Sequence, residues 1–230
     1  MLAKRKKISK KEMKEDKLVT SFYKAKELYT EYQSKIFIGL GVLVIIVAAV
    51  ILINQSGEKN NLKANALLAK VIPVYDGGQF QEAIDGRKLD NITGLKEIVE
   101  EYGSTEAGEM AKLYLANAYF YLGQFDNAMK NYKDFGGSGD DFKASSYAGI
   151  AACYEAKKEN KEAADYFKKA ASVSKANYQN PEFLLKAGIN LVALNQNEDA
   201  KELFLKIKED YKTSMAAYEV DKYLAIVDAK

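Results

Sequence analysis

The longest apolar run in the chain covers residues 36–53 and reads IFIGLGVLVIIVAAVILI. It contains no charged residue, and only four of its 18 positions are not Ile, Leu, Val or Phe. As a helix rising about 1.5 Å per residue, the run spans about 27 Å, close to the hydrocarbon thickness of a bilayer. Its 14 large apolar residues favour insertion by about 4 to 8 kcal/mol. We therefore predict a transmembrane helix at 36–53 that contacts the lipid bilayer.

Two other interpretations of this run fit the sequence less well. A signal peptide has a short basic start and an apolar core of about 7 to 15 residues followed by small residues, whereas here 35 residues precede the run and NQSGEKN follows it. A core helix of this length would carry a polar face, and this run has none. A single membrane span is the better prediction.

The segment before the span, residues 1–35, predicts a basic tail with an amphipathic helix. Apolar residues recur there at alternating spacings of four and three, which is typical of a helical stripe. The stripe is Leu18, Phe22, Ala25, Tyr29, Tyr32 and Ile36. Three roles remain open for this helix: it lies among lipid headgroups with KRKK (residues 4–7) near anionic lipid, it packs on a partner helix, or it is a solvated spacer.

Charge sets the expected orientation of the span. The first 35 residues hold 11 Lys or Arg against 5 Asp or Glu, while residues 54–230 hold 23 basic and 27 acidic side chains. By the positive-inside bias the tail stays in the cytoplasm and residues 54–230 lie across the inner (cytoplasmic) membrane, which in a bacterium is the periplasm.

Beyond the span, the pattern predicts helices without alternating strand segments, and the helices recur as a repeat. The segments GQFQEAIDG (78–86), GQFDNAMKNY (123–132), KENKEAADYF (158–167) and NQNEDAKELF (195–204) align on Ala83, Ala128, Ala163 and Ala200. The last three alanines are 35 and 37 residues apart. A period slightly above 34 with two helices per unit belongs to helical solenoids.

The side chains around each alanine explain the spacing. Twelve residues earlier, in the predicted first helix, stand Val71, Ala116, Ala151 and Gly188. Three of these are small, so the two helices of a hairpin can approach closely there. Four residues after three of the alanines, Tyr132, Phe167 and Phe204 fill the space one turn on. Arg87 breaks this pattern in the first copy, which is therefore the weakest.

These residues resemble the tetratricopeptide repeat (TPR), with degenerate copies. The tryptophan usual in that family is absent, and Leu67, Lys112, Tyr147 and Leu184 occupy those places. With one anchor after a basic tail, the whole layout is similar to the membrane-anchored TPR proteins of the YfgM type, ancillary to the Sec translocon, and more so to a form found in Bacteroidetes and Chlorobi. The expected fold is all-α: one transmembrane helix followed by a TPR-like solenoid over 54–230.

The chain offers little for catalysis. It has no histidine, and its lone Cys153 lies in an apolar helical run, where a buried thiol is expected. Adjacent acids such as Glu100 and Glu101, or Asp140 and Asp141, point about 100° apart on a helix and cannot share a proton or metal. GGSGDD lacks the lysine and preceding strand of a phosphate loop. We predict no enzyme activity, cofactor or metal, and no nucleic-acid binding by the acidic C-terminal part.

A protein or peptide partner is the remaining expectation. The first helices of stacked hairpins line a concave face, and some of these side chains are expected to be ordinary core. The resemblance implies a groove comprising Leu113, Asn117, Phe120, Tyr121, Ala148, Ala152, Glu155, Leu185, Ile189 and Val192.

Three functions stay open for this groove. The first is an anchored interaction module or scaffold accessory to protein export or periplasmic chaperoning. The second is an envelope scaffold for cell division or outer-membrane assembly. The third is an enzyme accessory or a cell-wall glycan binder, which the abundant tyrosines alone favour.

Overall fold

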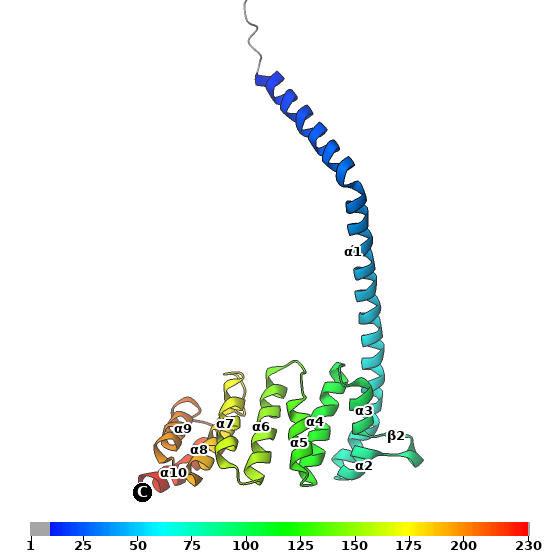
Figure 1. The fold of residues 1–230 in the computed structure, drawn as a ribbon. Coiled ribbons are helices and arrows are strands. Elements are labelled where there is room, and N and C mark those ends of the chain that lie inside the picture. Colours follow the sequence, from blue (N-terminus) through cyan, green and yellow to red (C-terminus); the bar gives the residue numbers. More distant parts are fainter. Residues whose placement is uncertain (1–9, 230) are drawn as a thin grey trace, which may run out of the picture. The chain divides into compact units, whose positions relative to one another are not determined.

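The computed structural model describes residues 10–229. The basic cluster KRKK at 4–7 lies outside the described residues. The chain divides into two compact units, residues 1–56 and 57–230 (Figure 1). The fold is all-α in its essentials, as the sequence predicts, with one small two-stranded addition described below.

The first unit consists of a single long helix. Helix α1 (Lys10–Asp76) is unbroken through the apolar run and continues into the second unit. Every residue from 36 to 53 is exposed to its surroundings, with Ile45 69% and Ile53 68% exposed. A core helix would bury these side chains, so that interpretation of the run is excluded. By length and composition, α1 is suited to crossing a membrane.

The second unit is a row of helix hairpins that follow one another along the chain (Figure 1). The end of α1 pairs with α2 (Phe80–Asp85), and α3 (Leu95–Tyr102) leads into the next hairpin. The remaining helices are α4 (Glu106–Tyr121), α5 (Phe125–Lys133), α6 (Asp140–Ala156), α7 (Asn160–Ser172), α8 (Asn180–Ala193), α9 (Asn197–Asp210) and α10 (Met215–Asp228). Consecutive helices pack on one another, which makes the unit a TPR-like α-solenoid.

Each hairpin turn has the same backbone. Gly78, Gly123, Lys158 and Asn195 all adopt a positive φ, between 59° and 75°. After each of them, the next N–H reaches back to the carbonyl five residues earlier, for example Gln124 to Tyr119. This is the Schellman ending of a helix. The glycine in YLGQFDN is therefore one instance of a repeated turn, as the repeat alignment predicts.

The small residues lie where the sequence analysis expects them. Ala83, Ala128, Ala163 and Ala200 are all completely buried, and so are Val71, Ala116 and Ala151. Two glycines make room for the aromatic residues of the repeat. A Cβ on Gly149 would strike the Tyr132 ring, and a Cβ on Gly188 would strike the Phe204 ring. The aromatic residues of the repeat thus fill space that these glycines leave empty.

The first hairpin departs from the predicted pattern of helices alone. Its second helix, α2, ends at Asp85, and a two-stranded antiparallel pair follows: β1 (Gly86–Arg87) and β2 (Ile92–Thr93), joined by the 3-10 turn Lys88–Asp90. This short pair is an addition to the predicted helices and leaves the all-α fold class unchanged. Gly86 has φ 84°, and a Cβ there would meet the Ile92 carbonyl and Gly94, so the chain can turn out of the helix only at a glycine.

Side-chain hydrogen bonds cap the N-termini of two helices, α4 and α10. Thr105 caps α4 by accepting a hydrogen bond from the Gly108 N–H, and Ser214 caps α10 by accepting one from the Ala217 N–H. Asn61 of α1 also accepts a bond from the Ala107 N–H, at 2.8 Å. Helix α3 ends at Tyr102, and Tyr211 follows the end of α9.

Candidate functional site

The predicted groove residues all lie on the first helix of a hairpin, α4, α6 or α8. We call their side of these helices the first-helix face. Tyr121 is exposed, at 63%, while Leu113 and Leu185 are buried and pack in the core. The remaining predicted residues are partly exposed: Asn117, Phe120, Ala148, Ala152, Glu155, Ile189 and Val192.

The structure forms a hollow of about 230 Å³ on this face, between α4 and α6. Its floor includes two of the predicted residues, Leu113 and Asn117, and its rim includes Phe142, which is 43% exposed. Most of the lining residues were not predicted from the sequence, although Met110 stands three positions before Leu113 on the same helix. The complete lining is Met110, Leu113, Tyr114, Asn117, Tyr132, Phe142 and Ser145.

Asn117 is held in place by tyrosines. The Tyr132 hydroxyl donates a hydrogen bond to the Asn117 side-chain oxygen. Burial raises the pKa of Tyr132 well above its usual range. Burial also raises the pKa of Tyr75 to about 12, and a hydrogen bond with Asn117 opposes that shift. Both phenols therefore remain neutral at physiological pH, and the Asn117 oxygen is engaged within the protein rather than held out for a ligand.

An aromatic cluster continues from this hollow toward the first hairpin. The rings of Phe80 and Tyr121 stack 4.7 Å apart, and Tyr75 meets both Phe80 and Tyr114 edge to face. Such ring pairs are rigid and partly apolar. Because Tyr121 is stacked but still mostly exposed, its free surface is available as an apolar anchor for a bound chain.

The other end of the face is polar. Glu155 on α6 accepts a hydrogen bond of 2.9 Å from the buried Asn190 of α8, and Lys186 lies 3.9 Å from the same carboxylate. These contacts join the α6 and α8 parts of the face. Glu155 is therefore occupied in linking two hairpins, while the apolar anchors gather at the α4 end.

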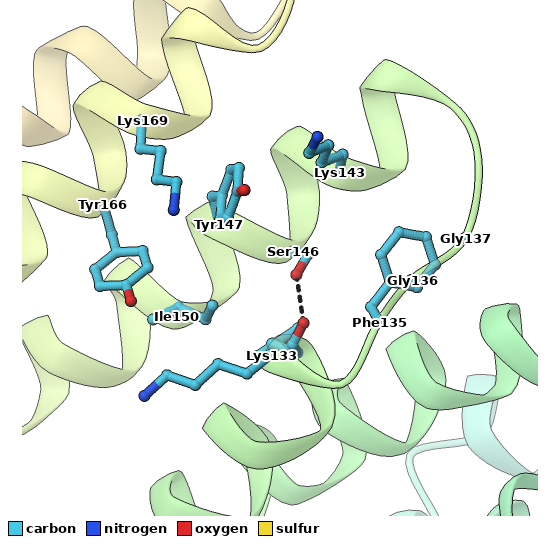
Figure 2. A pocket seen from close by; sticks show the side chains of 11 residues that line it. Lys133, Phe135, Gly136, Gly137, Lys143, Ser146, Tyr147, Ile150, Tyr166 and Lys169 are labelled. Carbon is cyan, nitrogen blue, oxygen red and sulfur yellow. Dashed lines mark hydrogen bonds between the residues drawn. The ribbon is translucent and has the colours of Figure 1, made fainter. Parts of the chain in front are cut away.

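The structure also contains a second cleft, of about 460 Å³, between α5, α6 and α7. Figure 2 shows lysine and aromatic side chains from these helices and from the Phe135–Gly137 loop around it. This cleft could not be predicted from the sequence, because its residues are far apart in the repeat pattern and few of them stand at a repeat-defining position.

Comparisons with known proteins agree with this architecture. Two segments, residues 110–137 and 182–214, match the tetratricopeptide repeat. No protein among those with curated descriptions matches the chain.

Among solved structures, the chain is similar to two crystal structures of the nearly identical TPR-like repeats of a Podosopora anserina putative kinesin light chain. The first, of a point variant, shares 16% identity and a TM-score of 0.56 over 73% of this chain and 85% of that one. The second gives a TM-score of 0.55 at 16% identity over 73% and 86%. The chain therefore contains tetratricopeptide repeats and shares the fold of a TPR-like solenoid.

Proposed function

We propose that this repeat-containing chain is a membrane-anchored module that binds extended polypeptides on its first-helix face. The observation that carries the proposal is the hollow between α4 and α6, which the partly exposed Phe142 lines. The exposed Tyr121 stands one helical turn after the lining residue Asn117 on α4. Aromatic anchors next to a pocket are the usual energetic centre of a protein interface. TPR folds serve generally as interaction scaffolds rather than as catalysts.

The anchor in this proposal is the 36–53 segment of α1. A run of exposed Ile, Leu and Val is stable in lipid and costly in water. The basic residues before it support an N-terminus in the cytoplasm and a repeat unit outside it, in the periplasm of a bacterium. Confinement to a membrane raises the local concentration of the binding face, so that weak contacts become effective.

The anchored layout supports a role as an accessory of protein export, at the Sec translocon or in periplasmic chaperoning. Polypeptides leaving a translocon are unfolded and expose apolar side chains, which suits a face with aromatic anchors. The alternative partners are division or outer-membrane assembly proteins.

Site-specific photocrosslinking in cells tests the proposal. The photoreactive residue replaces Tyr121, whose ring is exposed one helical turn after Asn117, and a control replaces Glu202, which is exposed on α9 away from the first-helix face. We expect Tyr121, and not Glu202, to crosslink nascent exported chains or translocon subunits.

The products separate the alternatives. Crosslinking of division or outer-membrane assembly proteins from position 121 would indicate an envelope scaffold. Crosslinking of glycan alone would indicate a cell-wall glycan binder. Equal crosslinking from both positions, or none from Tyr121, would refute the first-helix face as the binding surface.

A further inference from the structure

The second cleft has a composition unlike the rest of the second unit. Three lysines line it, Lys133 from α5, Lys143 from α6 and Lys169 from α7, and no carboxylate residue does. The body around it is acidic overall, with 27 acidic against 23 basic side chains over residues 54–230. The cleft is therefore locally basic, although the net charge of residues 54–230 is negative.

These three lysines have no acidic partner. Within residues 10–229, the ion pairs of the second unit involve Arg87 and other lysines, and none includes Lys133, Lys143 or Lys169. The nearby Glu109 does not neutralise them. It is paired with Lys112 at 2.7 Å and accepts the Gly136 N–H at 2.8 Å. The cleft therefore retains its positive charge.

Two aromatic rings of the cleft hold the Lys169 ammonium group. The Lys169 ammonium lies 4.2 Å from the centre of the Tyr147 ring and 5.6 Å from that of Tyr166. Figure 2 shows the Lys169 amine directed toward the space between these rings. The cleft wall is also fixed on its α5 side, because the Ser146 hydroxyl donates a 2.7 Å hydrogen bond to the Tyr132 carbonyl.

The cleft is separate from the first-helix face. On α6, the cleft residues Lys143, Tyr147 and Ile150 are centred about 140° around the helix from the face residues at 148, 152 and 155, at about 100° per residue. The cleft and the hollow between α4 and α6 thus lie on different sides of α6, and they share Tyr132 as a lining residue.

We propose that this cleft is a second docking site and that it binds an acidic segment of a partner polypeptide. Carboxylate side chains match three unpaired ammonium groups, and the rings of Tyr147 and Tyr166 provide apolar contact for the chain between them. A flexible segment fits a recessed cleft in an acidic body, whereas a flat anionic surface such as a bilayer would be repelled by the surrounding carboxylates. The site gives the molecule two faces that can hold different polypeptides at the same time.

The test uses the full-length protein in neutral detergent and a fluorescent peptide of alternating Glu and Tyr, with a matched peptide of Gln and Tyr. We expect the Glu peptide to bind at least about tenfold more tightly, and its affinity to fall as salt rises from about 50 to about 300 mM. The variant Lys133→Gln/Lys143→Gln/Lys169→Gln is expected to lose at least about tenfold in affinity.

The control variant, Lys70→Gln/Lys130→Gln/Lys161→Gln, removes the same charge from exposed lysines outside the cleft and is expected to bind as the parent does. Circular dichroism of both variants separates lost binding from lost folding. Because Lys169 also contacts the rings, Lys143→Gln alone gives a second measurement that leaves the cleft wall intact.

Equal weakening by both triple variants would mean a general charge effect and would overturn the site. Equal binding of the Glu and Gln peptides would do so as well. Competition by inorganic phosphate at millimolar concentration, without discrimination between the peptides, would identify a simple anion site instead. Displacement of the Glu peptide by an anionic lipid added to the detergent, and not by a neutral lipid, would identify a lipid site. Failure of the Tyr121 crosslinks leaves this test unaffected.

Discussion

At the residue scale, the hairpin turns require a positive φ, which suits glycine, but two of them carry another residue. Two of the four turns place glycine at the positive-φ position, but Lys158 and Asn195 adopt φ 62° and 59° with a side chain present. A left-handed conformation costs a residue with a Cβ about 1 to 2 kcal/mol. Replacing such a residue with glycine removes this cost. The extra conformational freedom of glycine in the unfolded chain offsets about 0.5 to 1 kcal/mol of the stability gained.

We therefore expect Lys158→Gly to raise the free energy of unfolding by about 0.5 kcal/mol. Conversely, Gly123→Ala, at φ 72°, is expected to lower it by about 1 kcal/mol. Urea unfolding followed by circular dichroism measures both. A lower midpoint for Lys158→Gly would show that the lysine side chain makes a compensating contact.

The buried thiol adds a pH dependence at the same scale. Burial raises the pKa of Cys153 from its ordinary value of 9.0 to about 12. The unfolded chain releases this proton near pH 9 and the folded chain keeps it. The contribution to stability is therefore complete below pH 9 and is lost as the pH rises toward 12, by at most about 1.4 kcal/mol per pH unit.

Urea midpoints between about pH 8 and pH 10 measure this loss, and Cys153→Ala is expected to flatten the curve. Burial also raises the pKa values of the Tyr75 and Tyr132 phenols, but these titrate in the unfolded chain only near pH 10, so they affect this range less. An unchanged slope in the variant would mean that Cys153 ionises equally in both states.

The sequence alone predicts buried positions well where packing restricts the residue type at a fixed spacing along the chain. The repeat alanines and their small partners were found because close helix contact admits only small side chains. Gly149 was missed, although the Tyr132 ring excludes a Cβ there, because this contact joins two successive repeats. A pairing between repeats has no fixed spacing in a degenerate sequence. The same reason hid the lysine cleft, whose residues meet only after α5, α6 and α7 have packed together.

At the element scale, the first hairpin contains a short helix and a strand pair that the repeat periodicity does not predict. Ala83 and Val71 follow the repeat and are buried, but α2 stops after six residues. The sequence marked this copy as irregular through Arg87, and the strand pair explains the irregularity. Strands of two residues each are too short for an alternating pattern, so the sequence could not predict them.

The last helix, α10, covers the end of the row of hairpins. We expect that disrupting its packing destabilises only the neighbouring helices. Val220 is completely buried in the cluster that contains Phe204 and Ile207. Val220→Asp would bury an unpaired carboxylate. In a solenoid each repeat depends mainly on its neighbours, so we expect faster hydrogen exchange in α8 to α10 and unchanged exchange in α4 and α5. Ala225→Asp, an exposed site on the same helix, is the control. Uniform loss of protection would indicate global cooperativity instead.

At the scale of the whole molecule, the sequence carried the strongest prediction, because insertion into lipid depends on composition summed over a segment rather than on any packing detail. The described helix leaves residues 36–53 exposed, and this surface needs either lipid or removal of the segment. The variant Ile45→Arg/Ile46→Arg shifts insertion by about 6 to 8 kcal/mol, which matches the whole predicted gain. We expect the parent chain to stay with membranes after alkaline carbonate extraction, and the arginine variant to be released.

The control Ile45→Leu/Ile46→Leu keeps the hydrophobicity and should remain bound. An epitope tag at the N-terminus distinguishes an anchor from a cleaved leader, because the anchor retains the tag on the membrane-bound chain. Protease added to intact spheroplasts should then degrade the repeat unit and leave the tagged tail protected. Recovery of an untagged, soluble repeat unit would replace the anchored module with a secreted one, and would remove the local-concentration argument on which weak binding at the first-helix face depends.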